Sequence, residues 1–242
     1  MKTLIISDIH NNVAKLEAHI DAWYSEYKFD ELVFLGDYFD SFGDNPKVAA
    51  QTAEWLAHSV QQDNRIHLLG NHDMPYMLPY NNSLWCPGFS APKLREIQKF
   101  ISADLWALFR PAVYVQNWLL SHAGFARDVV EHPVLGVASA EGLVNSAETA
   151  LNIVKTGISS PYFNPGSRLG EPYTGGITWC DWNDEFVPID GINQILGHTP
   201  SPFVRCISGP SSTNYCMDTF NKHLCLITDG SIEFISAIKL RG

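Results

Sequence analysis

Leu4-Ile5-Ile6-Ser7-Asp8 opens the stretch of sequence that decides the fold. Three apolar residues are followed at once by polar ones, which is typical of a short strand buried on both faces. The arrangement recurs in Leu32-Val33-Phe34-Leu35 before Gly36-Asp37, and in Ile66-His67-Leu68-Leu69 before Gly70-Asn71. The three runs therefore predict three buried strands, each of which ends in glycine or polar residues.

Helical segments separate these runs. Asn12 is expected to cap a helix over residues 12–24, and Pro46 stands in the first turn of a helix over residues 46–61. This alternation of strands and helices implies parallel pairing in an α/β sheet. Further along we expect helices at 93–109 and 138–155, strands at 112–120 and 192–196, a mobile loop rich in Gly, Pro and Ser at 157–176, and antiparallel strands at 203–238.

The length and composition point to a globular cytoplasmic protein. Its 242 residues are expected to form a single domain, 1–242, with a lid insertion at about 74–110. The net charge of −10 disfavours general nucleic-acid binding. The five cysteines contain no CxxC pair, which indicates neither a disulfide framework nor a thiolate zinc site. Neither a signal peptide nor a membrane span is predicted.

Oxygen and imidazole donors stand at the ends of five predicted strands. They are Asp8 and His10, Asp37 and Asp40, Asn71 and His72, His122, and His198. A single such residue is usually a cap or turn residue, but in an open α/β sheet the strand ends build the site. Asp73, which follows His72, is interpreted as a loop or helix-cap residue.

These donor types favour a pair of transition-metal ions. Carboxylate, carboxamide and imidazole ligands suit Mn, Fe, Zn or Ni better than calcium, which prefers oxygen ligands alone. Asp37 has two carboxylate oxygens and could bridge two ions. Two metals about 3.5–4 Å apart polarise a phosphoryl group and generate a hydroxide between them.

The same residues resemble the motifs of the calcineurin-like metallophosphoesterases, and within them the phosphoprotein phosphatase branch. That branch includes bacterial and phage serine/threonine phosphatases and diadenosine tetraphosphatases. The motifs are Asp8-Ile9-His10, Gly36-Asp37-Tyr38-Phe39-Asp40, Gly70-Asn71-His72-Asp73, His122-Ala123-Gly124 and Gly197-His198-Thr199-Pro200. The resemblance implies a four-layer αββα sandwich, with two mixed β-sheets flanked by helices.

The resemblance also implies a role for each residue. Asp8, His10 and Asp37 would hold the first metal, and Asp37, Asn71, His122 and His198 the second. A hydroxide bridging the two metals would attack the phosphorus directly. His72 would be the general acid that protonates the leaving alcohol, and Asp40 would orient it. Manganese is the expected metal, with iron, zinc or nickel as alternatives.

One position departs from the family pattern. The branch continues the second motif as Asp-Arg-Gly, whereas Asp40 is followed here by Ser41-Phe42-Gly43. The arginine that would bind phosphate bidentately is therefore missing. Another arginine is expected to enter the site, with Arg168 as the first choice and Arg127 as the second, and Asn71 would also contact the substrate.

Three functions compete at this point. The first is a metal-dependent phosphomonoesterase for phosphoserine or phosphothreonine. The second hydrolyses dinucleoside polyphosphates or another small phosphoester, with aromatic residues of the lid stacking on a base. The third is a non-catalytic scaffold, which is disfavoured because every ligand position is filled. The expected partner is a phosphorylated substrate, either a phosphoprotein or a small phosphoester, with no membrane involved.

Overall fold

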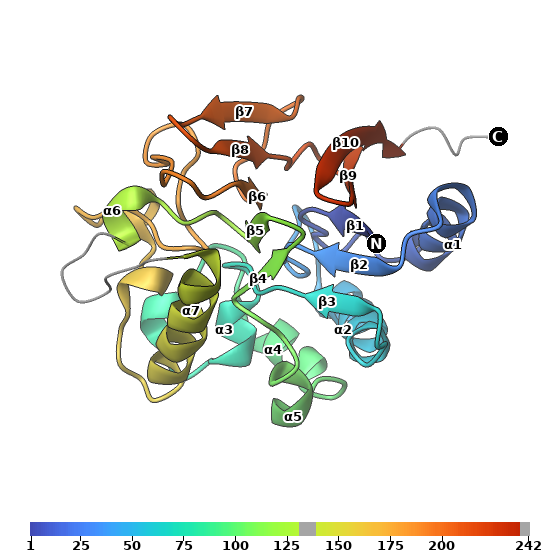
Figure 1. Cartoon of the computed structure of the whole chain (residues 1–242). Helices are drawn as coiled ribbons and strands as arrows, with labels where there is room; N and C mark the ends of the chain where they lie inside the picture. Colours follow the sequence, from blue (N-terminus) through green and yellow to red (C-terminus); the bar gives the residue numbers. More distant parts are fainter. Residues whose placement is uncertain (131–138, 238–242) are drawn as a thin grey trace.

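A computed structural model describes residues 1–130 and 139–237, which form two five-stranded β-sheets flanked by helices (Figure 1). The predicted α/β class with two mixed sheets is therefore confirmed. No helix in the described ranges is long and apolar enough to cross a membrane. Ala138 and Ile238, at the ends of two predicted elements, lie outside the described residues.

The first sheet carries the three strands that open the sequence. Its order is β10-β9-β1-β2-β3. Strands β1 (Lys2–Ile6), β2 (Glu31–Phe34) and β3 (Arg65–His67) are parallel, as predicted. Strand β9 (His223–Thr228) pairs antiparallel with β1, and β10 (Ser231–Ser236) pairs antiparallel with β9 at the edge.

The second sheet has the order β4-β5-β6-β8-β7. Strands β5 (Trp118–Ser121), β6 (Gln194–Leu196) and β8 (Thr213–Cys216) are parallel. Strands β4 (Ala112–Val115) and β7 (Arg205–Ser208) pair antiparallel with β5 and β8. The antiparallel strands predicted for the tail therefore divide between the two sheets, because β7 and β8 join one sheet and β9 and β10 the other.

Alternate residues of the strands face two different cores. Ile5, Val33, Leu120 and Ile195 come from both sheets and form the buried core between them. Leu4 belongs to the larger core on the other side of the first sheet, with residues of α1 (Leu16–Tyr27) and α2 (Pro46–Ser59). Helix α7 (Ala140–Val154) packs against β4 of the second sheet. Because successive side chains of a strand point to opposite faces of the sheet, a continuous apolar run contributes residues to the core on each face.

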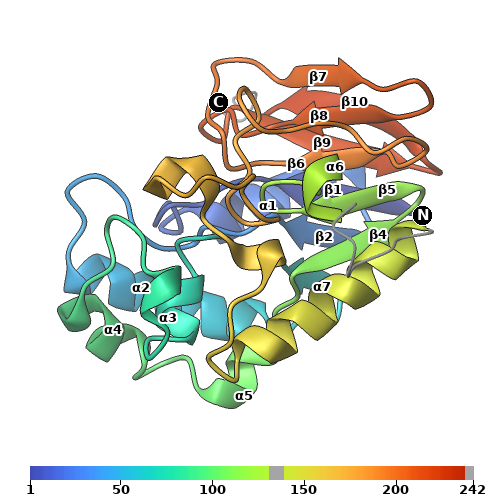
Figure 2. The same ribbon diagram turned by 90° about the vertical axis from the view of Figure 1, so that its left-hand side faces the viewer.

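Segment 74–110 forms short helices rather than one long one. It contains α3 (Met74–Met77), η1 (Asn82–Leu84), α4 (Ala91–Ile97) and α5 (Ala103–Trp106). Figure 2 shows α3 and α4 on the same side of the molecule as α2, and α4 packs directly against α2. The long connection between β5 and β6 contains α6 (Arg127–Val130), η2 (Pro161–Phe163) and η3 (Gly166–Leu169).

Three predicted elements differ in the structure. Helix α1 begins at Leu16, not at Asn12, whose side chain donates to the carbonyl of Ile9 in the turn before it. The helix predicted at 93–109 is divided into α4 and α5, because Ser102 takes an extended backbone and caps the second helix. The strand predicted at 112–120 is a hairpin, since Gln116 and Asn117 both have positive φ angles, as a two-residue turn requires.

Candidate metal centre

The predicted site residues meet where the parallel strands of both sheets end. Asp8 and His10 follow β1, Asp37 and Asp40 follow β2, Asn71 and His72 follow β3, His122 follows β5, and His198 follows β6. Because parallel strands present their carboxyl ends at one edge, loops that are distant in sequence converge there. The first sheet supplies the carboxylates, and the second sheet supplies two of the imidazoles.

Two groups of potential metal ligands share one carboxylate. Asp8, His10 and Asp37 have ligand atoms within 4.8 Å of one another, and so have Asp37, His122 and His198. The Nε2 atoms of His10 and His122 lie 3.7 Å and 3.3 Å from Asp37 Oδ2. A shared carboxylate between two ligand groups is the arrangement that a bridging residue requires.

Each of the three histidines in these groups is oriented by a backbone carbonyl. The Nδ1 atom of His10 lies 2.7 Å from the Asp40 carbonyl oxygen, and that of His122 lies 3.0 Å from the Leu35 carbonyl oxygen. The Nε2 atom of His198 lies 3.1 Å from the carbonyl oxygen of Trp179. A proton held on these nitrogens leaves the other ring nitrogen as an acceptor toward the centre, which is how metal-binding histidines are usually held.

Asn71 places one end of its amide among acceptors only. That end lies 3.0 Å from His198 Nδ1, 3.1 Å from His122 Nε2 and 3.3 Å from Asp37 Oδ2. Without a cation, an amide nitrogen would have to occupy this place to satisfy them. A divalent cation among the same acceptors would instead be bound by the amide oxygen, so the residues fit a metal ion.

The charged groups of the cluster shift one another's pKa values. Burial opposes ionisation of Asp37, yet the adjacent His122 holds the pKa of this carboxyl well below its usual value. Burial lowers the pKa of His122, but Asp37 outweighs it and raises that pKa to about 9. Asp37 therefore favours a positive charge beside it, and a metal ion bound by neutral His122 would supply that charge in place of the second imidazole proton.

The loops reach this geometry through unusual backbone conformations. His10, Asp37, Asp40 and His198 all have φ angles between 43° and 68°, in the left-handed region. This region costs a residue other than glycine about 1–2 kcal/mol. Gly70 allows the close approach of two loops, because a Cβ atom there would lie 2.1 Å from Asp37 Oδ1. Strained backbone of this kind concentrates at functional sites.

Asp73 has a larger role than the predicted loop or helix cap. It stands before α3 but makes no cap bond. Instead its buried carboxylate accepts from the backbone N–H groups of Asp37, Tyr38 and Gly70, at 2.8, 2.9 and 2.8 Å. Burial, with the charge of Asp37, raises the pKa of Asp73 to about 7. Asp73 therefore fixes the loop that carries Asp37, a function that its position beside His72 did not reveal.

His72 lies beside the two ligand groups and is held by Asp40. Its Nδ1 atom lies 3.0 Å from Asp40 Oδ2. Burial lowers the pKa of His72, but the charges of Asp37 and Asp40 outweigh it and raise that pKa overall. Burial likewise opposes ionisation of Asp40, and hydrogen bonds from His72 and Lys93 lower its pKa nonetheless. The carboxylate of Asp40 therefore favours the protonated form of the imidazole.

Segment 74–110 supplies further partners of Asp40. The Tyr76 hydroxyl donates to Asp40 Oδ1 at 2.6 Å, and the Lys93 ammonium donates to the same oxygen at 2.5 Å. Lys93 is 5% exposed and also donates to both Asp44 oxygens at 3.1 Å. Sequence analysis did not identify either residue, because a lysine in an amphipathic helix is ordinarily solvated.

Cys86 completes the surroundings of His72. Its Sγ atom lies 3.4 Å from His72 Nδ1, and with Asp40 the three side chains form a further group of potential ligand atoms. Burial raises the pKa of the Cys86 thiol, so the sulfur keeps its proton. Since a thiol must lose its proton to bind a metal, this group is a poorer metal site than the other two.

We expect Lys93→Met to lower the free energy of unfolding by about 3–5 kcal/mol, because Asp40 and Asp44 would lose their buried cation. Lys99→Met is the matched control. Lys99 also pairs with a carboxylate, on Glu96, but 60% of its side chain is exposed. That loss should stay below about 1 kcal/mol. Urea unfolding of both variants measures the difference, and equal losses would contradict the structural role of Lys93.

The two arginines proposed for phosphate binding lie in different surroundings. Arg168, in η3, donates to Asp181 Oδ2 and, at 3.1 Å, to the hydroxyl of Thr199, which follows His198. Arg127, in α6, donates to the carbonyl of Pro188 at 2.8 Å. Contact with the residue next to His198 favours Arg168 as the cation nearer the centre.

Comparisons with known proteins establish the family of the chain. The chain belongs to the calcineurin-like phosphoesterase family, whose model matches residues 1–227. The motifs quoted from the sequence lie within that range, so the resemblance to this family is confirmed. None of the curated proteins has a matching sequence.

Several solved structures are similar to this chain at low sequence identity. A cold-active protein-tyrosine phosphatase of a Shewanella species is 14% identical, over 97% of this chain and 80% of that chain, with a TM-score of 0.57. A protein serine/threonine phosphatase from Saccharomyces cerevisiae is 12% identical, over 98% and 80%, with a TM-score of 0.48. A phosphoesterase from E. coli is 12% identical, over 99% and 94%, with a TM-score of 0.45.

Proposed function

We propose that the protein is a phosphomonoesterase that works with two divalent metal ions. The observation that carries this proposal is the pair of ligand groups sharing Asp37, with the hydrogen-bonded pair of His72 and Asp40 beside them. Asp8, His10 and Asp37 would hold one ion, and Asp37, Asn71, His122 and His198 the other. Bound ions would polarise the phosphoryl group and supply a nucleophilic water at neutral pH.

Side chains of the protein would donate the proton, orient the general acid and bind the phosphoryl oxygens. His72 would give its proton to the oxygen of the leaving alcohol, because the charges of Asp37 and Asp40 raise its pKa and so favour the protonated imidazole. Asp40 would hold the imidazole through Nδ1 and leave Nε2 toward the substrate. Arg168 and Asn71 would bind the outer phosphoryl oxygens, in place of the missing arginine after Asp40.

A general acid of this kind matters most for alkyl esters, whose alkoxide leaving group is a strong base. Phosphoserine and phosphothreonine are such esters, and we propose them as the first substrate class. Small phosphoesters, including dinucleoside polyphosphates, are the second. An open cavity lined by residues 81–85 and by residues from the segment between Ser159 and Thr174 offers room for the non-phosphate portion of a small ester. Manganese is our proposed metal, because the ligands combine oxygen and imidazole donors.

Chelation should abolish activity toward a chromogenic phosphate ester, and manganese should restore it best. The reason is that carboxylate and imidazole ligand atoms of the two groups converge where metal ions would polarise the phosphoryl group. The measurement is the initial rate after EDTA treatment and after titration with each metal, together with metal content by elemental analysis. Full activity in metal-free protein would rule out the proposed function.

Arg168→Ala should raise KM for phosphomonoesters about tenfold, the value of one charge-assisted hydrogen bond, without changing metal content. The loss should be smaller for Arg127→Ala, because Arg127 bonds to Pro188 rather than to a residue beside a ligand. Steady-state kinetics on both variants makes the comparison. Unchanged KM and kcat in both would mean that the substrate is held by its non-phosphate portion.

A further inference from the structure

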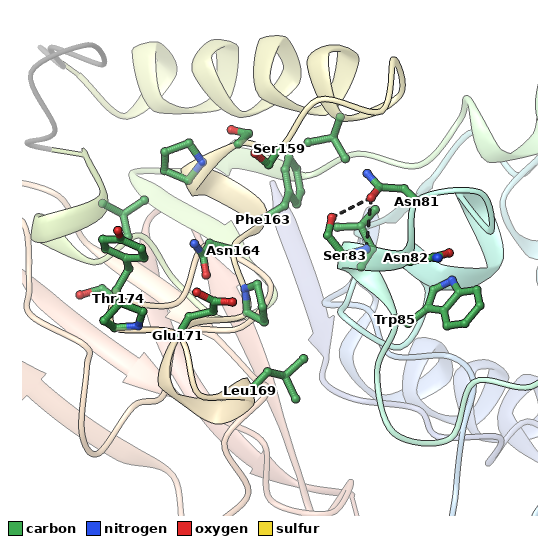
Figure 3. Close-up of a pocket in the computed structure, with 18 of the residues that line it drawn as sticks. Asn81, Asn82, Ser83, Trp85, Ser159, Phe163, Asn164, Leu169, Glu171 and Thr174 are labelled. Carbon is green, nitrogen blue, oxygen red and sulfur yellow. Dashed lines mark hydrogen bonds between the residues drawn. The ribbon is translucent and has the colours of Figure 1, made fainter.

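An open cavity of about 890 Å³ lies between two segments that flank the metal centre (Figure 3). Residues 81–85 form one wall, and residues from the segment between Ser159 and Thr174 contribute to the other. Figure 3 shows Trp85 and Asn81 on one side of the cavity and Phe163 and Leu169 on the opposite side. The metal centre with its general acid does not account for this cavity, whose lining residues include none of the proposed ligands.

Both walls are joined directly to the centre. Trp85 precedes Cys86, whose sulfur lies 3.4 Å from His72 Nδ1. On the other side, Leu169 follows Arg168, which donates to the Thr199 hydroxyl beside His198. With His72 as the general acid, the leaving group of a phosphoester at the metal centre would lie beside His72, which contacts Cys86, the residue after Trp85.

The charge of the lining excludes a second anionic group. Asp128 and Glu171 contribute carboxylates, and none of the lining residues in the described part of the chain is Lys, Arg or His. In a protein of net charge −10, such a cavity repels phosphate. It therefore suits the uncharged portion of a phosphoester better than a polyphosphate chain.

Aromatic rings give the cavity a stacking surface. Trp85 is 43% exposed, yet its ring is held in place by Phe89, at a centroid distance of 4.8 Å, and by a hydrogen bond to the Pro79 carbonyl at 3.3 Å. Tyr173, on the opposite wall, is 65% exposed. A rigid, exposed indole is well suited to stack on a planar ring, because little conformational freedom is lost on binding.

Amide groups line the same space. Asn81 is 8% exposed, and its Oδ1 atom accepts from Ser83, while its Nδ2 atom has no hydrogen-bond partner among residues 1–130 and 139–237. A buried donor without an acceptor is unfavourable, and a ligand that brings an acceptor relieves it. Asn82 and Asn164 add further donors and acceptors. Phenyl and aliphatic groups have no such acceptor, whereas a heteroaromatic base has several.

We propose that this cavity binds the uncharged heteroaromatic base of a nucleoside monophosphate whose phosphoryl group lies at the metal centre. The assignment rests on the proposed function and narrows its substrate class, from small phosphoesters in general to nucleoside monoesters. Trp85 stacks on the base, and Asn81 donates to one of its acceptors. A dinucleoside polyphosphate is disfavoured, because the described lining residues of the cavity include no cationic side chain to bind its further phosphates.

The kinetic test compares adenosine 5′-monophosphate with ribose 5-phosphate, two alkyl phosphates that differ in the base alone. The manganese-loaded enzyme should prefer the nucleotide about tenfold or more in kcat/KM, the value of one stacked base. Trp85→Ala should remove that preference, and Trp85→Phe should keep part of it. Tyr24→Ala, which removes an exposed ring from α1, is the matched control and should leave the preference unchanged.

A binding test distinguishes failure of the base-binding assignment from failure of the proposed phosphatase function. Titration calorimetry with adenosine, which has no phosphate, should show binding to EDTA-treated protein that Trp85→Ala weakens about tenfold and Tyr24→Ala does not. Binding of adenosine by a protein without phosphatase activity would uphold the cavity and refute the proposed function. Equal kcat/KM for both phosphates, or adenosine binding that Trp85→Ala leaves intact, would overturn the assignment. So would a stronger Trp85-dependent preference for a phosphopeptide.

Discussion

Asp37→Asn is expected to reduce turnover roughly 10³-fold, about 4 kcal/mol of transition-state stabilisation, and to deplete both metal ions. Asp37 is the only residue common to the two ligand groups that the described residues form around the proposed ion positions. The amide keeps the size of the carboxylate but loses its charge and one of its two acceptor oxygens. Both ions should therefore bind more weakly after this single change.

The measurement combines metal analysis with the rate on a chromogenic phosphate ester. Asp21→Asn, at an exposed position of α1, is the control for a lost carboxylate elsewhere and should change neither quantity. The circular dichroism spectrum of the Asp37→Asn protein should match that of the parent. Near-normal metal content and rate would show that Asp37 does not bridge the ions.

His72→Asn is expected to lower turnover roughly 10²–10⁴-fold on alkyl phosphates while both metal ions stay bound. His72 belongs to neither of the two ligand groups that share Asp37, and Asp40 orients its ring. The loss should shrink on nitrophenyl phosphate, because nitrophenolate leaves without a proton. Asp40→Asn should give a milder form of the same effect.

The control for this prediction is His58→Asn, at an exposed position of α2. It should leave the rates on both substrates unchanged. An equal loss on alkyl and nitrophenyl phosphates in His72→Asn would mean that His72 positions the substrate or binds a metal. A loss of metal content would point to the second of these.

The sequence predicted the core of the first sheet and the position of the site because both depend on local patterns. Leu4-Ile5-Ile6 can bury both faces only as a strand between two layers, and its polar continuation must then stand at the sheet edge. The same pattern at Leu32 and Ile66 made parallel pairing the simplest arrangement, which the register of β1, β2 and β3 confirms.

Local patterns were less reliable where a segment could adopt two conformations of similar free energy. Residues 93–109 have helical character throughout, but Ser102 offers a cap to a second helix, and the chain divides there. Residues 112–120 are suited to one strand or to a hairpin. Gln116 and Asn117 form the turn although neither is glycine, because pairing β4 with β5 outweighs the cost of two positive φ angles.

The sequence by itself determined the chemical types at the site, since each donor belongs to a short motif directly after a strand. Only the tertiary structure decided which groups surround them. Lys93 and Tyr76 reach Asp40 from residues more than thirty positions away, and Asp73 holds the backbone of Asp37. Their effect comes from burial, which makes each partner of a charge costly to lose. Burial depends on how distant segments pack, and no local pattern carries that information.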